Sequence, residues 1–170
     1  KKLKPILEDS SIKKVGQNIK YDFIIFKNNG IELSSVEDTM LLSYTLDAGN
    51  NRHNMDTLSE LHLGHKTISY KDLVGTGKKQ LNFADVDIKP ATEYAAEDAD
   101  ITLRLYEVLS ERVSEEKLER VYEEFEKPMI KILSRLEMNG IKVDDTYLKK
   151  LSKKFEERLI TIEKEIYKIS

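Results

Sequence analysis

The sequence predicts an α/β fold in which helices outnumber strands. Apolar residues recur at three- and four-residue steps along most of the chain, which is the spacing of one face of an α-helix. The clearest extended segment, at residues 13–17, is short. Because strand signals are sparse for this fold class, we expect that further strands precede Lys1 in a longer protein.

The first half of the chain contains four of the expected helices. They cover residues 3–8, 20–28, 38–46 and 55–63. The second of them ends at residues 29–30, Asn-Gly, where glycine suits the left-handed conformation of a helix C-cap. A polar loop at residues 47–52 follows the third helix.

The fourth helix carries candidate signals for its start and its end. Gly64 marks its end, and Asn54 or Asp56 could cap its first turn. Thr57 and Glu60 also have the spacing of a capping box. Sequence alone therefore leaves the first residue of this helix open.

A longer helix is expected at residues 90–113, opened by a proline that suits a first helical turn. One face of it carries Tyr94, Asp98, Ile101, Leu105 and Val108. Three of these residues are aliphatic, so this face is expected to turn toward the protein. A carboxylate there needs a partner, because burying an unpaired charge is costly. A metal ion is one candidate partner, and the alternative is a structural role in which the Asp98 carboxylate accepts a hydrogen bond from a backbone amide.

The last third of the chain is expected to form a second unit. Residues 114–127 are highly charged and mark the boundary, which divides the chain into residues 1–114 and 115–170. A further helix is expected at residues 128–138, and Asp144 or Asp145 is expected to cap a final long helix. The apolar stripe of that helix continues to the last residue, which again suggests a piece of a longer protein. Glycine-rich residues 75–79 are expected to form a loop.

Composition excludes several classes of protein. The chain has 170 residues, 39% hydrophobic and 35% charged, as in a globular domain. A net charge of -3 argues against a general surface for polyanions. There are no cysteines, which excludes disulfides and thiolate zinc sites and fits a reducing cytoplasm. No apolar run approaches the roughly 20 residues of a membrane span, so we expect no membrane partner.

The carboxylates and the tyrosine suggest a specific chemistry. Hydrolysis of a phosphodiester can use two divalent ions about 4 Å apart, held by converging carboxylates. Asp22 and Asp98 are candidates for two of these acids, and Tyr94 is a candidate for orienting the attacking water. Asn18 and Tyr21 could hold the substrate strand.

Two segments resemble signature motifs of a known family. Residues 15–22 (VGQNIKYD) and 94–100 (YAAEDAD) are similar to two of the three motifs of the 3′→5′ proofreading exonuclease domain of bacterial DNA polymerase I, in the DEDD (DnaQ-like) group. Residues 37–41, 52–58 and 65–68 also resemble that domain. Residues 126–144 resemble the opening of the polymerase domain. The last helix would then be the start of the thumb region of that domain. The resemblance implies a ribonuclease H-like exonuclease fold, truncated at its N-terminal strands, followed by a helical polymerase segment.

The resemblance also implies roles for individual residues. Asp98 and Asp22 would ligate Mg²⁺ or Mn²⁺, two ions in the complete site, and Tyr94 would orient the attacking water. The single-stranded 3′ end of DNA would be contacted by Gln17, Asn18, Tyr21, Arg52 and Tyr70. The longer protein would synthesise DNA from dNTPs on a primer–template and remove mispaired ends, as a cytoplasmic monomer.

One departure from the family pattern limits this expectation. The first motif, Asp-x-Glu on an apolar strand, supplies two of four acids, and no such strand occurs in the chain. We therefore expect half a metal site and no nuclease activity from these 170 residues alone. Two alternatives stay open: a non-catalytic scaffold with an exonuclease fold, and an RNA-trimming exonuclease like ribonuclease D. The segment after residue 114 argues against the second.

Overall fold

The computed structural model describes residues 2–77 and 80–169. The chain divides into two compact units, Lys1–Met138 and Asn139–Ser170. In chain order the elements are α1 (Lys4–Glu8), β1 (Lys14–Gly16), α2 (Ile19–Asn28), β2 (Val36–Asp38), α3 (Thr39–Asp47), α4 (Met55–Leu63), α5 (Tyr70–Val74), the 3₁₀-helix η2 (Phe83–Asp85), α6 (Ile88–Glu115), α7 (Glu119–Val121), the π-helix η3 (Tyr122–Glu126), α8 (Lys127–Asn139) and α9 (Asp145–Ile169).

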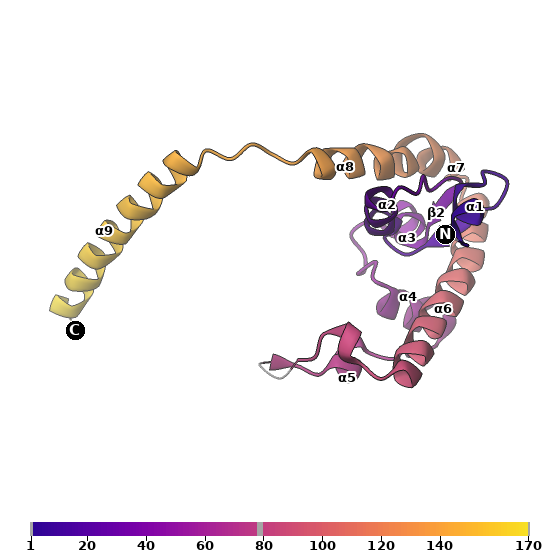
Figure 1. The fold of residues 1–170 in the computed structure, drawn as a ribbon, viewed down its shortest axis with the longest axis horizontal. Helices are drawn as coiled ribbons and strands as arrows, with labels where there is room; N and C mark the ends of the chain where they lie inside the picture. Colours follow the sequence, from indigo (N-terminus) through magenta and orange to yellow (C-terminus); the bar gives the residue numbers. More distant parts are fainter. Residues whose placement is uncertain (1, 78–79, 170) are drawn as a thin grey trace. The chain divides into compact units, whose positions relative to one another are not determined.

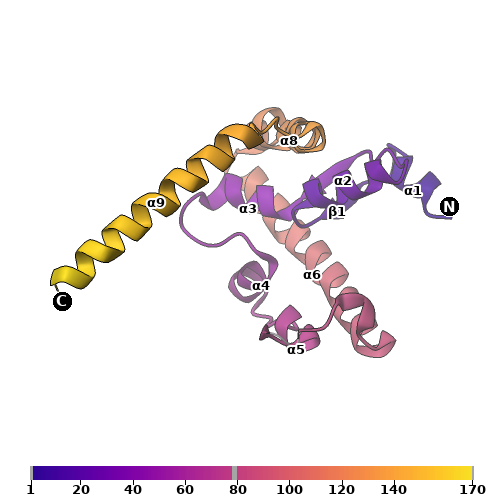
Figure 2. The same cartoon turned by 60° about the vertical axis from the view of Figure 1, so that its left-hand side comes forward.

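A small parallel sheet and the long helix α6 organise the first unit (Figure 1). Strands β1 and β2 pair in parallel, with Lys14 opposite Val36 and Gly16 opposite Asp38. Helices α3 and α4 pack against α6, which also contacts β1 (Figure 2). The described residues are thus mostly helical with a two-stranded sheet, consistent with a truncated α/β fragment.

The apolar face of α6 forms the main core. Ile101, Leu105 and Leu109 are at most 1% exposed and pack with Leu42 of α3 and Leu58 of α4. Burial of each such side chain contributes on the order of 2 kcal/mol. The expectation that the Tyr94–Asp98 face of this helix turns inward is therefore confirmed at Ile101 and Leu105, while Val108 is only partly buried. A second cluster, Ile19, Leu33, Val36 and Ile130, joins α2 and β2 to α8.

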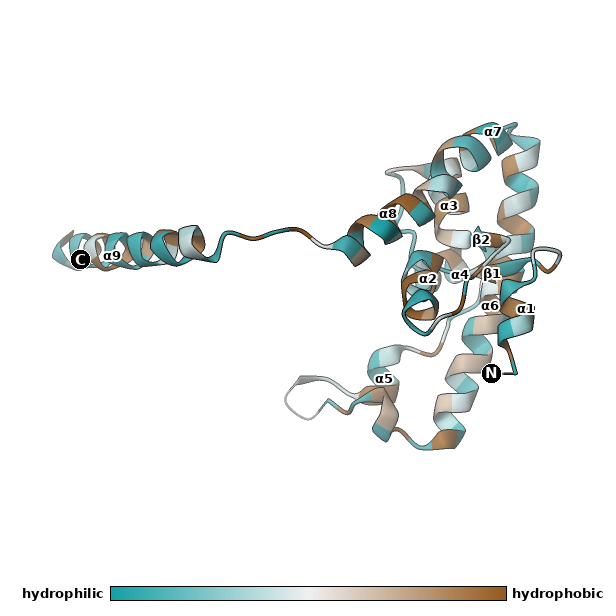
Figure 3. Ribbon diagram, turned by 45° about the horizontal axis from the view of Figure 1, so that its top comes forward, coloured by the Kyte–Doolittle hydropathy of each residue, from teal (hydrophilic) through white to brown (hydrophobic). Residues whose placement is uncertain are grey.

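The second unit is dominated by the amphipathic helix α9, whose polar and apolar residues alternate in stripes (Figure 3). Its start is capped as expected, because the Asp144 carboxylate accepts the Tyr147 backbone N–H at 2.9 Å. None of its described residues is buried within this chain. No helix among residues 2–77 and 80–169 has the length and apolar character that crossing a membrane requires.

Several expected boundaries need correction. The helix expected from residue 38 begins at Thr39, because Asp38 ends β2 and caps the helix by accepting the Met40 N–H. The capping box at Thr57 and Glu60 is wrong, since α4 already begins at Met55. The charged stretch at residues 114–127 is helical for most of its length.

The middle of the chain differs from expectation in one helix. Helix α5 was not predicted from the sequence pattern. Residues 78 and 79 of the expected 75–79 loop lie outside the described residues.

Candidate functional site

A cavity of about 570 Å³ brings together residues from both halves of the first unit. Its lining comprises Lys13, Val15, Gly16, Gln17, Asp22, Met55, Asp98, Ala99, Thr102 and Leu103. Asp22 comes from the first turn of α2 and Asp98 from α6, so two of the predicted acids share one cavity. Gln17, a third predicted residue, directly follows the end of β1 and also lines the cavity.

Asp98 lies in an environment that favours a cation. It is placed one turn before the buried Ile101, and its Oδ1 atom is buried without a hydrogen-bond partner in the part of the chain that the structure describes. Burial is the main cause that raises the pKa of Asp98, and the charges of Glu97 and Asp56 add to it, while a hydrogen bond from Tyr94 opposes it. An acceptor oxygen left unpaired in this way fits a site for a metal ion.

Tyr94 stays a neutral phenol at physiological pH. Burial and the adjacent charge of Asp98 raise its pKa to about 12. Its ring meets Tyr70 edge-on at 6.1 Å between centroids and Phe83 at 6.2 Å. Tyr70 is 44% exposed, so this aromatic cluster presents one face to solvent. Phe83 was not singled out from the sequence, because it lies outside the recognised motifs.

Asp22 is exposed, yet partial desolvation raises its pKa. The turn before it has an unusual backbone, with Asn18 in the left-handed conformation at φ 57°. The Asn18 side chain does not cap α2. Asp38 does so instead, because its carboxylate accepts the Asn18 N–H at 3.0 Å and the Ile19 N–H at 2.9 Å. Asp38 therefore supports the turn before Asp22, a role that was not predicted from the sequence.

Gln17 is fixed by two neighbours. Its Nε2 donates to the His53 carbonyl at 2.7 Å, and its Oε1 accepts the Thr39 hydroxyl. Because His53 follows Arg52 directly, this bond anchors the segment that carries the predicted arginine. Arg52 is exposed, and Tyr21 is 66% exposed.

The remaining predicted residues lie outside the cavity lining. The lining described above does not include Asn18, Tyr21, Arg52, Tyr70 or Tyr94. The structure thus brings Gln17, Asp22 and Asp98 together directly. Tyr94 and Tyr70 join the site through the Asp98 carboxylate and the aromatic cluster.

Glu97, next to Asp98, anchors the segment that leads to Tyr70. Its carboxylate accepts the Ile68 N–H at 2.6 Å and contacts His65 Nε2 at 2.8 Å. Burial acts to raise the pKa of Glu97, but these two hydrogen bonds together lower it. One turn of α6 therefore places Asp98 in the cavity lining and, through Glu97, is hydrogen-bonded to the loop that precedes α5.

Acidic groups in the described residues form only part of a possible metal centre. No group of three or more His, Cys, Asp or Glu side chains there has an arrangement that could hold a metal ion. The unpartnered Oδ1 of Asp98 and the shared cavity of Asp22 fit a metal site to which these residues contribute two carboxylates.

Comparison with known proteins identifies the family. A family model described as 3′-5′ exonuclease matches residues 1–114, so the chain belongs to the 3′-5′ exonuclease family of A-type DNA polymerases. This confirms the resemblance seen in the motifs.

Relatives of known name match nearly the whole chain. DNA polymerase I of Rhizobium leguminosarum is 51% identical over 98% of this chain and 16% of its own length. DNA polymerase I of Pseudomonas aeruginosa is 42% identical over 99% of this chain and 19% of its length, and that of Borreliella burgdorferi is 40% identical over 95% and 18%. The chain therefore spans less than a fifth of the length of these curated relatives.

Proposed function

We propose that the chain is part of a DNA polymerase I and contributes to a 3′→5′ exonuclease that removes mispaired primer ends. The observation that carries this proposal is the cavity shared by Asp22 and Asp98, with the unpartnered Oδ1 of Asp98. The proposed fold is ribonuclease H-like, with an exonuclease part at residues 1–114 and a polymerase part at residues 115–170. The longer protein would bind DNA and dNTPs and act as a monomer.

Asp98 and Asp22 are the residues that would hold Mg²⁺ or Mn²⁺. Carboxylate oxygens suit these hard cations. When bound, the ions supply an attacking hydroxide and stabilise charge on the oxygens of the phosphodiester. An Asp-x-Glu strand upstream of residue 1 would complete the set of acids.

Tyr94 is proposed to orient the attacking water. With a pKa of about 12, its hydroxyl keeps its proton throughout the physiological range, and its oxygen can accept a hydrogen bond from the attacking water while the proton is donated to Asp98. It shares one face of α6 with Asp98, which places the phenol beside the acid that would hold the metal. In this role the Tyr94 hydroxyl keeps its proton and orients the water without acting as an acid or a base.

The single-stranded 3′ end is proposed to cross the exposed side chains around the cavity. Tyr21 and Tyr70 are exposed aromatic residues on which unstacked bases can lie. Arg52 is available to pair with a phosphate. Gln17 and Asn18 lie at the turn between β1 and α2, where they can contact the terminal nucleotide.

A scaffold without chemistry is the second candidate function. The observation that favours it is that the described residues contain no group of three metal-ligating side chains. The two functions differ in the acids that the protein carries upstream of residue 1. An apolar strand with Asp-x-Glu there supports the exonuclease, and substituted acids support the scaffold.

An excision assay tests the proposed function. The full-length protein that carries this chain is given 3′-labelled single-stranded DNA, or RNA of the same sequence, with Mg²⁺ or with EDTA. We expect mononucleotides to be released from the 3′ end of DNA only when Mg²⁺ is present. Faster release from RNA would support a ribonuclease D-like activity, and no release from either substrate would support the scaffold.

A further inference from the structure

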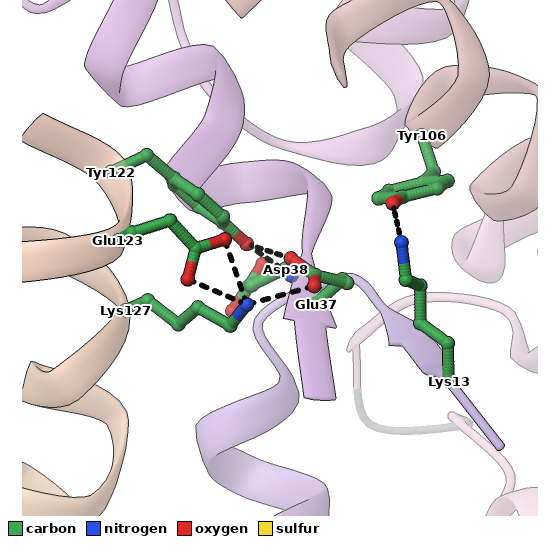
Figure 4. Close-up of polar contacts among 7 residues, drawn as sticks. All are labelled: Lys13, Glu37, Asp38, Tyr106, Tyr122, Glu123 and Lys127. Atoms are coloured by element: carbon green, nitrogen blue, oxygen red, sulfur yellow. Dashed lines mark hydrogen bonds and ion pairs between the residues drawn. The ribbon is translucent and has the colours of Figure 1, made fainter. Parts of the chain in front are cut away.

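A buried polar network ties β2 to the segment that follows α6 (Figure 4). The Tyr122 hydroxyl donates to Glu37 Oε2 at 2.9 Å and accepts the Asp38 backbone N–H at 3.0 Å. Lys127 Nζ donates to Glu37 Oε1 at 2.8 Å and to Glu123 at 2.9 Å. Tyr122 is 3% exposed and Glu37 8% exposed, so the two bonds of the Tyr122 hydroxyl are shielded from water, whereas the Lys127–Glu37 bond is part-buried and the Lys127–Glu123 bond is exposed.

The π-helical turn explains how two residues of one segment reach the same acid. Its wide i→i+5 pattern is seen directly, because the Lys127 N–H donates to the Tyr122 carbonyl. Tyr122 and Lys127 therefore point together at Glu37, as Figure 4 shows. Both lie beyond residues 1–114, which the exonuclease family model matches.

The other side of β2 reaches the candidate site. The Asp38 carboxylate is 1% exposed and accepts the N–H groups of Asn18, Ile19 and Met40. It thereby holds the left-handed turn at Asn18 and the first turn of α2, which carries Asp22 into the cavity. Lys127 and Tyr122 are thus hydrogen-bonded to β2 at Glu37 and at the Asp38 N–H, and the side chain of the same Asp38 is hydrogen-bonded to the start of α2.

We propose that Tyr122 and Lys127 are positioning residues for the exonuclease site. They hold β2 through Glu37 and the Asp38 N–H, and Asp38 in turn sets the position of Asp22. Their effect on catalysis rests on the proposed function, whereas their effect on the α2 turn does not. The segment after the exonuclease match would then be required for proofreading geometry as well as for joining two domains.

Hydrogen exchange tests the positioning step independently of activity. Exchange is followed by mass spectrometry in the full-length protein, in a peptide covering residues 17–22 and in one covering residues 101–109. The variant Tyr122→Phe keeps the ring but removes the hydroxyl that accepts the Asp38 N–H. We therefore expect amide exchange in the first peptide to become about tenfold faster, which is the factor that corresponds to the loss of one buried hydrogen bond. The second peptide, in the core of α6, should be unchanged. Equal acceleration of both peptides, or none, would overturn the proposal.

Matched variants separate the network from general effects on this segment. Lys127→Met should accelerate the 17–22 peptide as Tyr122→Phe does, and Lys127→Arg should restore slow exchange because it keeps the charge. Arg120→Met is the control, since it removes only the exposed ion pair with Glu124. If Arg120→Met had the same effect as Lys127→Met, the network would not be the cause.

Excision kinetics test the catalytic consequence. Small displacements of a reacting group cost up to about a hundredfold in rate, and we expect Tyr122→Phe and Lys127→Met to lower kcat for excision of single-stranded DNA about tenfold. KM for DNA should stay within about twofold, because the contacts with the strand are kept. The Mg²⁺ concentration that gives half-maximal rate should rise, because Asp22 is displaced.

Asp98→Ala is assayed beside the two network variants. If Asp98→Ala excises like the parent, the proposed function fails; if it is inactive while both network variants keep full kcat, the positioning proposal fails.

Discussion

Asp22 on α2 and Asp98 on α6 line one cavity, and partial desolvation raises the pKa of both carboxyl groups. Acids that are brought together at a cost in solvation are typical of functional sites. A divalent cation would offset that cost, because it stabilises the charged form of both groups. The predictions below follow from this relationship and from the hydrogen bonds that maintain it.

Replacing Asp98 should stabilise the metal-free protein at neutral pH. The pKa of Asp98 is higher in the folded chain than its ordinary value of 3.8, so the folded state binds the proton more tightly than the unfolded state. Stability contributed by this group is therefore present at low pH and lost as pH rises through the folded pKa. Asp98→Asn removes that loss, so its Tm in EDTA should exceed that of the parent near neutral pH and match it below 3.8.

The control for this comparison is Asp100→Asn, which changes an exposed carboxylate on the same helix. It should not reproduce the pH-dependent difference. A lower Tm for Asp98→Asn near neutral pH would show that the Asp98 carboxylate is satisfied by the protein itself.

Divalent cations should stabilise the parent protein and not the Asp98→Asn variant. A ligand that binds only the folded state at about ten times its Kd adds about 1.4 kcal/mol of stability. Thermal melts of the full-length protein with Mn²⁺ or Mg²⁺ measure this effect without any substrate. An equal shift in Tm for the parent and for Asp98→Asn would place the cation elsewhere.

Asp38→Ala should be among the more damaging substitutions in the first unit. It leaves the N–H groups of Asn18, Ile19 and Met40 without their acceptor in a buried place, which we expect to cost about 3 kcal/mol of unfolding free energy. Ser69→Ala removes a helix cap whose bond to Lys71 is exposed, and it should cost about 1 kcal/mol or less. Denaturant titration compares the two. Similar costs would mean that Asp38 does not hold the α2 turn.

The 170-residue chain by itself should not degrade single-stranded DNA with Mg²⁺. Its cavity contains two carboxylates, Asp22 and Asp98, whereas the proposed site uses four acids. Release of labelled nucleotides from the 3′ end is the measurement, with the full-length protein as the positive control. Efficient release by the 170-residue chain would show that its own residues complete the site.

The sequence predicted the parts of the fold that depend on local periodicity. The apolar face of α6 was readable because Ile101 and Leu105 recur at helical spacing and are buried. Strand β2 was not, because it contains three residues, two of them acidic, and acidic residues in a sequence do not suggest a buried strand. Glu37 and Asp38 are buried there only because distant groups satisfy them.

The candidate site was predictable to a similar degree. The motifs identified Asp22, Asp98 and Tyr94 through their resemblance to a family. Asp38 and Tyr122 were missed for a physical reason: their roles are long-range hydrogen bonds, to Asn18 in one case and to Glu37 in the other. Residues 114–127 were interpreted as a boundary between two units because they are highly charged, and their charge pattern does not indicate that Tyr122 is buried.

The most direct test of the exonuclease assignment is Asp98→Ala in the full-length protein, assayed for both excision and synthesis. Asp100→Ala serves as the matched control, because it lies two residues away on the exposed side of α6. We predict that Asp98→Ala abolishes release of nucleotides from the 3′ end of single-stranded DNA, while primer extension with dNTPs continues at the parental rate. Unchanged excision, or equal loss of excision and synthesis, would contradict the account.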